Sequence, residues 1–272
     1  MTTPAESAEL KSCCAAVYQS DLVRMLLGDS FHPGGERLTA RLGEQLGLGP
    51  GLRVLDVASG KGESAIFLAR RFGCRVVGID LGPQSVVEAR SRAEAAQAAQ
   101  QVSFVEGDAE HLDFPDADFD AVICECAFCT FPDKHAAASE FARVLRPGGR
   151  VGMSDLTRSG PLPQDLEGLL AWIACIADAR PVEQYAGYLK EAGLDVTVIE
   201  PHDRALAEMA RDVQGRLLGV EIMVKLKKLD LPGVDFEQAN QLARAAAKAI
   251  REGLLGYSLI VARSRAGEAA CF

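Results

Sequence analysis

The sequence predicts an α/β fold in which a mostly parallel β-sheet is covered by helices on both faces. Between residues 53 and 155, short apolar runs rich in β-branched residues alternate with segments of helical spacing. Continuous apolar strands are typical of sheets buried on both faces, and strands that alternate with helices form parallel sheets. The length of 272 residues and a hydrophobic content of 48% allow one large domain with an extensive core.

The alternating region contains five predicted strands with helices between them. The strands are 53–59, 74–80, 102–109, 119–126 and 149–156, and the helices are 63–72, 83–97 and 133–145. Pro83 opens the second helix, and the turn Arg-Pro-Gly-Gly at 146–149 ends the third, as expected of proline and glycine at helix termini.

The pattern changes after Asp155 and becomes mainly helical. Helices are predicted over 161–179, 181–193, 204–228 and 236–252, with strands over 196–201 and 256–263. The first 40 residues are also largely helical in pattern. We therefore expect one domain in three parts. These are an N-terminal helical arm (1–40), an α/β core (41–160), and helical insertions with final strands on the substrate side (161–272).

Charge and composition exclude several classes of partner. The formal net charge is −9 and no Lys/Arg block stands out, so we expect neither nucleic-acid nor membrane binding. The first residues lack a basic leader with an apolar run, so we expect no signal peptide and a cytoplasmic location. Cytosolic thiols are kept reduced, so the eight cysteines favour free thiols over a disulfide scaffold.

A ligand site is predicted where the first three strands end. Gly60 and Gly62 permit a tight turn and a close approach of a ligand to the following helix, although many such turns hold glycines for packing alone. Asp80, 18 residues after Gly62, can bind ribose hydroxyls, and Asp108 can reach an adenine amine. The turn lacks the third glycine of the dinucleotide pattern, since residue 65 is Ala, and it lacks the lysine of a phosphate loop.

Four segments in order, "VLDVASGKGES", "VVGID", "VEGDAEHLDFPDADFD" and "LRPGGRVGMSDL", resemble the class I S-adenosylmethionine-dependent methyltransferases. The resemblance covers residues 53–156. It implies a Rossmann-like seven-stranded sheet in which 256–263 is an antiparallel strand, with S-adenosylmethionine as cofactor and S-adenosylhomocysteine as product. Most relatives have glycine in place of Ala58, and an acid is common in place of Ser64. The implied cofactor-binding residues are Asp56, Ala58, Ser59, Gly60, Gly62, Asp80, Leu81, Asp108, Ala109 and Cys124.

The cysteines Cys124, Cys126 and Cys129 lie within six residues at the end of the fourth strand. Residues two apart on a strand point the same way, so Cys124 and Cys126 are expected on one side, with Glu125 opposite if the extension persists. Core packing is a simple alternative, because cysteine is a common small core residue. A zinc site would need a second C-x-x-C pair, and a thioredoxin-like role would need the pair at a helix N-terminus.

Three further cysteines, one at residue 175 and an adjacent pair near the N-terminus, lie outside the predicted apolar core. On the expected helix 165–178, Cys175 falls opposite the apolar stripe of leucines and isoleucines, on a face of small residues. Near the N-terminus, Cys13 and Cys14 are adjacent, and a helical arm over the carboxyl edge of the sheet could bring one of them to the same cavity. A soft ligand such as trivalent arsenic takes two or three thiolates.

The segments "CECAFCTFPDK" and "WIACIADARPVEQYAGYLKEAGL" resemble two segments of arsenite methyltransferases. This resemblance implies Cys126 and Cys175 as arsenic ligands, with Cys13 or Cys14 as a third. We therefore expect Cys126, Cys175 and Cys14 to be catalytic, and Cys13, Cys129 and Glu125 to join them in binding substrate. Arsenic would then be the substrate of an arsenic-detoxifying enzyme rather than a resident metal, and a thiol reductant such as thioredoxin or glutathione would be a partner.

Three questions remain open from the sequence, namely the function of the chain and the roles of Glu125 and His32. The acceptor can be an ordinary organic molecule, with the cysteines lining its pocket, or the chain can be a thiol-based metal or metalloid-binding protein. Glu125 can neutralise the cofactor's sulfonium, hold the arm, or face solvent. His32 can touch the cofactor or substrate, or be an ordinary turn residue.

Overall fold

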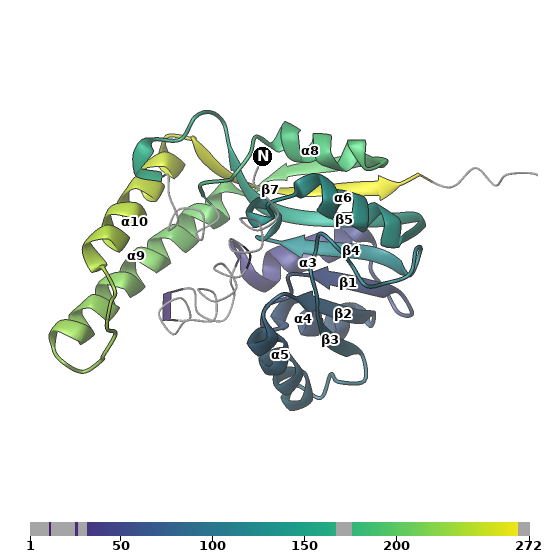
Figure 1. Ribbon diagram of the computed structural model, residues 1–272, viewed down its shortest axis with the longest axis horizontal. Helices are drawn as coiled ribbons and strands as arrows, with labels where there is room; N and C mark the ends of the chain where they lie inside the picture. Colours follow the sequence, from purple (N-terminus) through teal and green to yellow (C-terminus); the bar gives the residue numbers. More distant parts are fainter. Residues whose placement is uncertain (1–10, 12–24, 27–31, 167–175, 266–272) are drawn as a thin grey trace, which may run out of the picture.

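The computed structural model describes residue 11 and residues 25–26, 32–166 and 176–265. Over these residues it contains a seven-stranded sheet in the order β3-β2-β1-β4-β5-β7-β6 (Figure 1). The long alternating region of the sequence supplies the first five strands, as predicted. The strands are β1 (Arg53–Val57), β2 (Arg75–Asp80), β3 (Val102–Glu106), β4 (Phe119–Glu125), β5 (Leu145–Arg158), β6 (Leu194–Pro201) and β7 (Leu255–Ser264).

The sheet is mostly parallel, with one antiparallel strand. Strand β1 pairs in parallel with β2 and β4, and the parallel pairing continues from β2 to β3 and from β4 to β5. Strand β7 pairs antiparallel with both β5 and β6, between which it lies although it comes last in the chain. The predictions of a mostly parallel sheet and of a final antiparallel strand are confirmed.

The order of the strands places helices on both faces of the sheet. From β1 the chain moves outward to β2 and β3 through α4 (Glu63–Phe72) and α5 (Pro83–Ala95), whereas α6 (Lys134–Val144) joins β4 to β5 in the opposite direction. Because parallel crossovers are right-handed, these two directions put α4 and α5 on one face and α6 on the other. Both faces are therefore covered, which agrees with the unbroken burial of residues 54–57 and 121–124.

The helix α3 (Gly35–Leu46) precedes the first strand and packs against both α4 and β5. Its residues Leu38, Leu42 and Leu46 are buried, and a side chain at Gly43 would overlap the ring of Phe72. The helix spans the predicted division between residues 40 and 41, so part of the expected arm is built into the core.

Of the three C-terminal helices described, one packs along the sheet and two extend beyond its carboxyl edge (Figure 1). Helix α8 (Val182–Glu191) packs on α6, and α9 (Asp203–Lys225) with α10 (Phe236–Arg251) forms an antiparallel pair between the end of β6 and the start of β7. Figure 1 shows this pair reaching outward on the side to which the parallel strands point. No helix within the described residues combines the length and apolar character that crossing a membrane requires.

The predicted helix over 161–179 is wrong at both of its described ends, since residues 161–163 and 176–179 are not helical. A short 3-10 turn covers Gln164–Leu166, and residues 177–178 form a turn instead of helix. The carboxylate of Asp178 forms ion pairs with Lys134 and Arg180. Arg180 also forms an isolated parallel β-bridge with Thr157. Tertiary ion pairs and sheet pairing therefore hold residues 176–180 outside a helix. Residues 167–175 lie outside the described part of the chain.

Substitution of Gly78 can test how tightly β2 packs on β3. A Cβ at this position would overlap the ring of Phe104 and lie 2.7 Å from Ser59 Oγ. We expect Gly78→Ala to lower the free energy of unfolding by about 1–3 kcal/mol through overpacking. Gly187→Ala is the matched control, because no atom lies within 4 Å of its Cβ and alanine favours helix α8. Urea unfolding measures both, and equal losses for the two variants would contradict this packing.

Candidate active site

The turn between β1 and α4 is held in an unusual backbone conformation. Ala58, Gly60 and Gly62 have φ values of 57°, 52° and 80°, in the left-handed region. The amide of Ser59 donates to Ile79 O at 3.0 Å, and that of Gly62 donates to Ser59 O at 2.8 Å. A side chain at Gly62 would overlap Phe104, so this glycine is required by packing and conformation within the protein itself.

Asp80 fixes this turn to the loop after β2. Its Oδ2 accepts a hydrogen bond from the amide of Gly60 and its Oδ1 accepts one from the amide of Gly82, both at 2.8 Å. Burial raises the pKa of Asp80, and the two amide donors oppose that rise. A carboxylate has about four acceptor positions, so Asp80 keeps capacity for the ribose hydroxyls that the sequence assigns to it.

Two buried polar atoms beside the turn have no partner within the part of the chain that the structure describes. Among the described residues, neither Asp56 Oδ2 nor Ser59 Oγ has a hydrogen-bond partner. Burial raises the pKa of Asp56 well above its usual range, and the charges of Glu125 and Asp80 add to the rise. Buried polar atoms are rarely left without partners, so this pair fits a site that awaits polar groups of a ligand.

Asp108 lies at the next strand end and receives a charged partner from the N-terminal segment. Lys11 Nζ is 2.7 Å from Asp108 Oδ2 and 2.5 Å from Glu110 Oε2. The amide of Glu110 donates to Asp108 Oδ1 at 2.9 Å. Leu81 is exposed and Ala109 is half-buried on the same edge. Residue 11 of the predicted arm therefore reaches the loop that the sequence assigns to adenine.

The three clustered cysteines occupy different environments. Cys124 and Cys129 are fully buried, whereas Cys126 is half-buried. Burial raises the pKa of the Cys124 thiol well above its usual range, and the charge of Asp155 adds to this. The amide of Cys129 donates to Asp155 Oδ2 at 2.9 Å. Cys124 and Cys129 therefore lie in the core, and core packing alone accounts for their presence there.

The prediction of a strand over 119–126 is wrong at its last residue, so strand spacing no longer places Cys126 on the same side as Cys124. Strand β4 ends at Glu125, and Cys126 has a φ of 54° in the left-handed region. Its amide donates to Ser154 O at 2.6 Å, which holds this conformation. Cys13, Cys14 and Cys175 lie outside the described residues. The described residues alone contain no group of three His, Cys, Asp or Glu side chains able to hold a metal.

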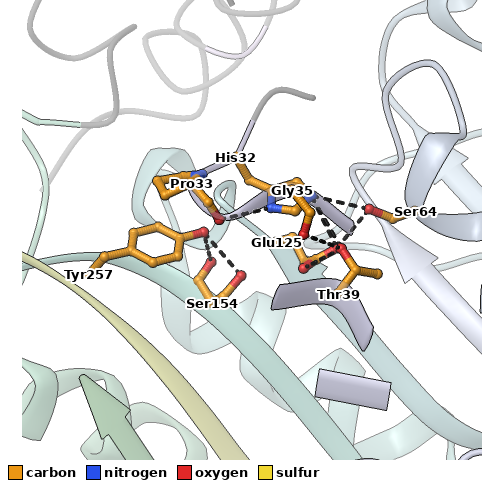
Figure 2. A network of polar contacts seen from close by, with 8 residues as sticks. All are labelled: His32, Pro33, Gly35, Thr39, Ser64, Glu125, Ser154 and Tyr257. Carbon is orange, nitrogen blue, oxygen red and sulfur yellow. Dashed lines mark hydrogen bonds and ion pairs between the residues drawn. The ribbon is translucent and has the colours of Figure 1, made fainter. Parts of the chain in front are cut away.

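Glu125 is the centre of a polar network that links three segments (Figure 2). The hydroxyl of Ser64 donates to Oε2 at 2.7 Å, and Thr39 Oγ1 lies 3.2 and 3.1 Å from Oε1 and Oε2. His32 Nε2 is 3.6 Å from Oε2, and His32 Nδ1 is 3.3 Å from Pro33 O. Of the roles left open for Glu125, holding the arm matches these contacts.

Thr39 and Ser64 are functional candidates that sequence reasoning missed. Thr39 sits on α3 and is buried, and its hydroxyl gives no motif signal. For Ser64 the sequence offers one clue, because this serine stands where relatives commonly have an acidic residue. Nearby, the Tyr257 hydroxyl donates to Ser154, whose O and Oγ lie 3.1 and 3.0 Å away, which also appears in Figure 2.

Comparison with known proteins agrees with this geometry. A family model described as "Methyltransferase domain" matches residues 54–149. The O-methyltransferase cnsE of Penicillium expansum is 32% identical over 251 residues, which cover 85% of this chain and 89% of that protein. The chain belongs to the class I S-adenosylmethionine-dependent methyltransferases.

Other methyltransferases match over different shares of their length. An arsenite methyltransferase of Halobacterium salinarum is 34% identical over 161 residues, covering 58% of this chain and 41% of that protein. A solved phosphoethanolamine N-methyltransferase 2 of Haemonchus contortus, in complex with S-adenosylhomocysteine, has a TM-score of 0.78 at 20% identity. The alignment covers 94% of this methyltransferase and 60% of the other chain, and it supports the fold.

The buried Asp56 makes the stability of this methyltransferase depend on pH. Its raised pKa means that the neutral form favours folding, and this contribution is lost as the pH rises from the unfolded value of about 3.8 through the folded value. We expect Asp56→Asn to raise the melting temperature at pH 8 and to approach the parent protein in acid.

Thermal unfolding between pH 5 and pH 8 checks this expectation. Asp195→Asn is the control, because Asp195 is more than half exposed. A constant difference between Asp56→Asn and the parent protein across this range would contradict the assignment of the raised pKa.

Proposed function

We propose that this methyltransferase transfers a methyl group from S-adenosylmethionine to a hydroxyl oxygen of a small organic molecule. The observation that carries the proposal is the burial of Cys124 and Cys129, which leaves Cys126 as the one partly exposed thiol of that cluster. Within this cluster one thiol at most is accessible, so the cluster by itself does not form a multi-thiolate site for arsenic. The similarity to an O-methyltransferase over 89% of that protein's length supports an oxygen acceptor.

The residues around the glycine turn fit the cofactor. Asp80 would hold its ribose, Asp108 its adenine, and Asp56 with Ser59 its remaining polar groups, because these atoms lie buried or half-buried at one sheet edge. S-adenosylmethionine supplies an electrophilic methyl group on a positively charged sulfur. Carboxylates gathered at this edge favour such a charge, and the rigid turn fixes the orientation on which transfer depends.

Acceptor chemistry is assigned to the segment that follows β4. Transfer forms a carbon–oxygen bond and breaks the bond between methyl and sulfonium, and the hydroxyl proton passes to solvent or to a base. Cys126 lies there with a half-buried side chain, next to Ser154 and the Tyr257 hydroxyl. Its contribution in this proposal is to shape the acceptor pocket rather than to ligate the substrate.

A second candidate acceptor is thiolate-bound trivalent arsenic. The turn at Cys126 supports it, because the left-handed backbone brings a cysteine out of the sheet at the end of β4, and an arsenite methyltransferase is among the relatives. Arsenic would need Cys175 and Cys13 or Cys14 in addition, and a cytosolic thiol such as thioredoxin or glutathione to reduce the product. The lone pair of arsenic attacks without losing a proton.

Substitution of Cys126 separates the two candidates. We expect Cys126→Ser to retain methylation of hydroxylated small molecules, because an oxygen acceptor needs no thiolate. The assay incubates the reduced protein with S-adenosylmethionine and either a panel of phenols and hydroxylated polyketides or arsenite and methylarsenite. Products are identified by mass spectrometry and by elemental detection of arsenic.

The outcome also names the acceptor. Methylated arsenic that is lost in both Cys126→Ser and Cys175→Ser would overturn the organic acceptor and establish the second candidate. O-methylated products that persist in Cys126→Ser would exclude a ligating role for this thiol.

A further inference from the structure

The Glu125 carboxylate is buried, and its partners come from distant parts of the chain. Its side chain is 4% exposed. Ser64 and Thr39, 61 and 86 residues away in sequence, place hydroxyls against it, and His32 adds an imidazole nitrogen (Figure 2). A buried carboxylate is costly unless donors surround it, so these contacts are required for the end of β4 to keep its position.

The residues that contact Glu125 belong to different parts of the site. Ser64 is the second residue of α4 and lies two residues after Gly62 of the glycine turn. Thr39 belongs to α3, which packs on β5, and His32 precedes that helix by a short turn. Glu125 itself directly precedes Cys126, where the chain leaves the sheet. One carboxylate therefore joins the cofactor side, the N-terminal segment and the acceptor side.

The charge of Glu125 also acts on the cofactor side. It contributes, after burial, to the raised pKa of Asp56. Asp56 and Asp80 lie at the ends of the neighbouring strands β1 and β2. The negative potential of this edge therefore depends in part on a residue that hydrogen bonds hold away from the surface.

We propose that Glu125 is a positioning residue for methyl transfer, which holds the cofactor turn through Ser64 and the N-terminal segment through Thr39 and His32. It acts through these residues and does not contact the reacting atoms. The proposal rests on the binding of S-adenosylmethionine and not on the identity of the acceptor.

The test measures the binding of S-adenosylhomocysteine by calorimetry to Ser64→Ala, Glu125→Gln and the double variant. We expect Ser64→Ala and Glu125→Gln each to weaken binding by about tenfold, which corresponds to about 1.4 kcal/mol. The double variant should be little weaker than either single variant, because both changes weaken the same charge-assisted hydrogen bond between Ser64 and Glu125. Glu106→Gln, at the exposed end of β3, is the control and should bind normally.

Stability measurements separate positioning from folding. Glu125→Gln keeps an oxygen that accepts from Ser64, so it should bind more tightly than Glu125→Ala at a similar melting temperature. Folded variants with unchanged affinity, or additive losses in the double variant, would overturn the proposal. Because no acceptor is present, a failure here is distinct from an error in the proposed substrate. Should Glu125→Ala fail to fold, Ser64→Ala and the double variant still decide the matter.

Discussion

The hydrogen bonds from the amides of Gly60 and Gly82 to Asp80 fix the geometry on which the rest of the site depends. A parallel sheet brings its strand ends to one edge, but the loops that follow are free to diverge unless something joins them. The Asp80 carboxylate joins the loop after β1 to the loop after β2. With that distance set, Asp56, Ser59 and Asp108 lie at one edge of the sheet, beside the proposed cofactor site.

Glu125 performs a similar role one strand further along. Together the two carboxylates hold loops that belong to three strands, β1, β2 and β4. Both are largely buried, and both depend on donors from other segments to remain there. The loops of the site are therefore held together by carboxylates whose burial would be costly without these donors.

Sequence patterns predicted the sheet and the cofactor loops because these depend on local properties. The buried strands of the alternating region are continuous apolar runs, and the glycine turn and Asp80 follow from spacing alone. The left-handed turn at Cys126 and the non-helical residues 176–179 depend on Ser154 and Lys134, which are distant in sequence. Likewise, nothing near Thr39 in the sequence indicates that it meets Glu125.

The position of β7 has a consequence for how the chain acquires its structure during synthesis. Strand β5 is complete once residue 158 has emerged, but its outer neighbour is residues 255–264. Until then, one edge of β5 exposes unpaired amides and carbonyls, and β6 has no strand to join. The ribosome must therefore add roughly a hundred residues after β5 before β7 is available to pair with β5 and β6. During that interval the unpaired strand edges make aggregation a hazard.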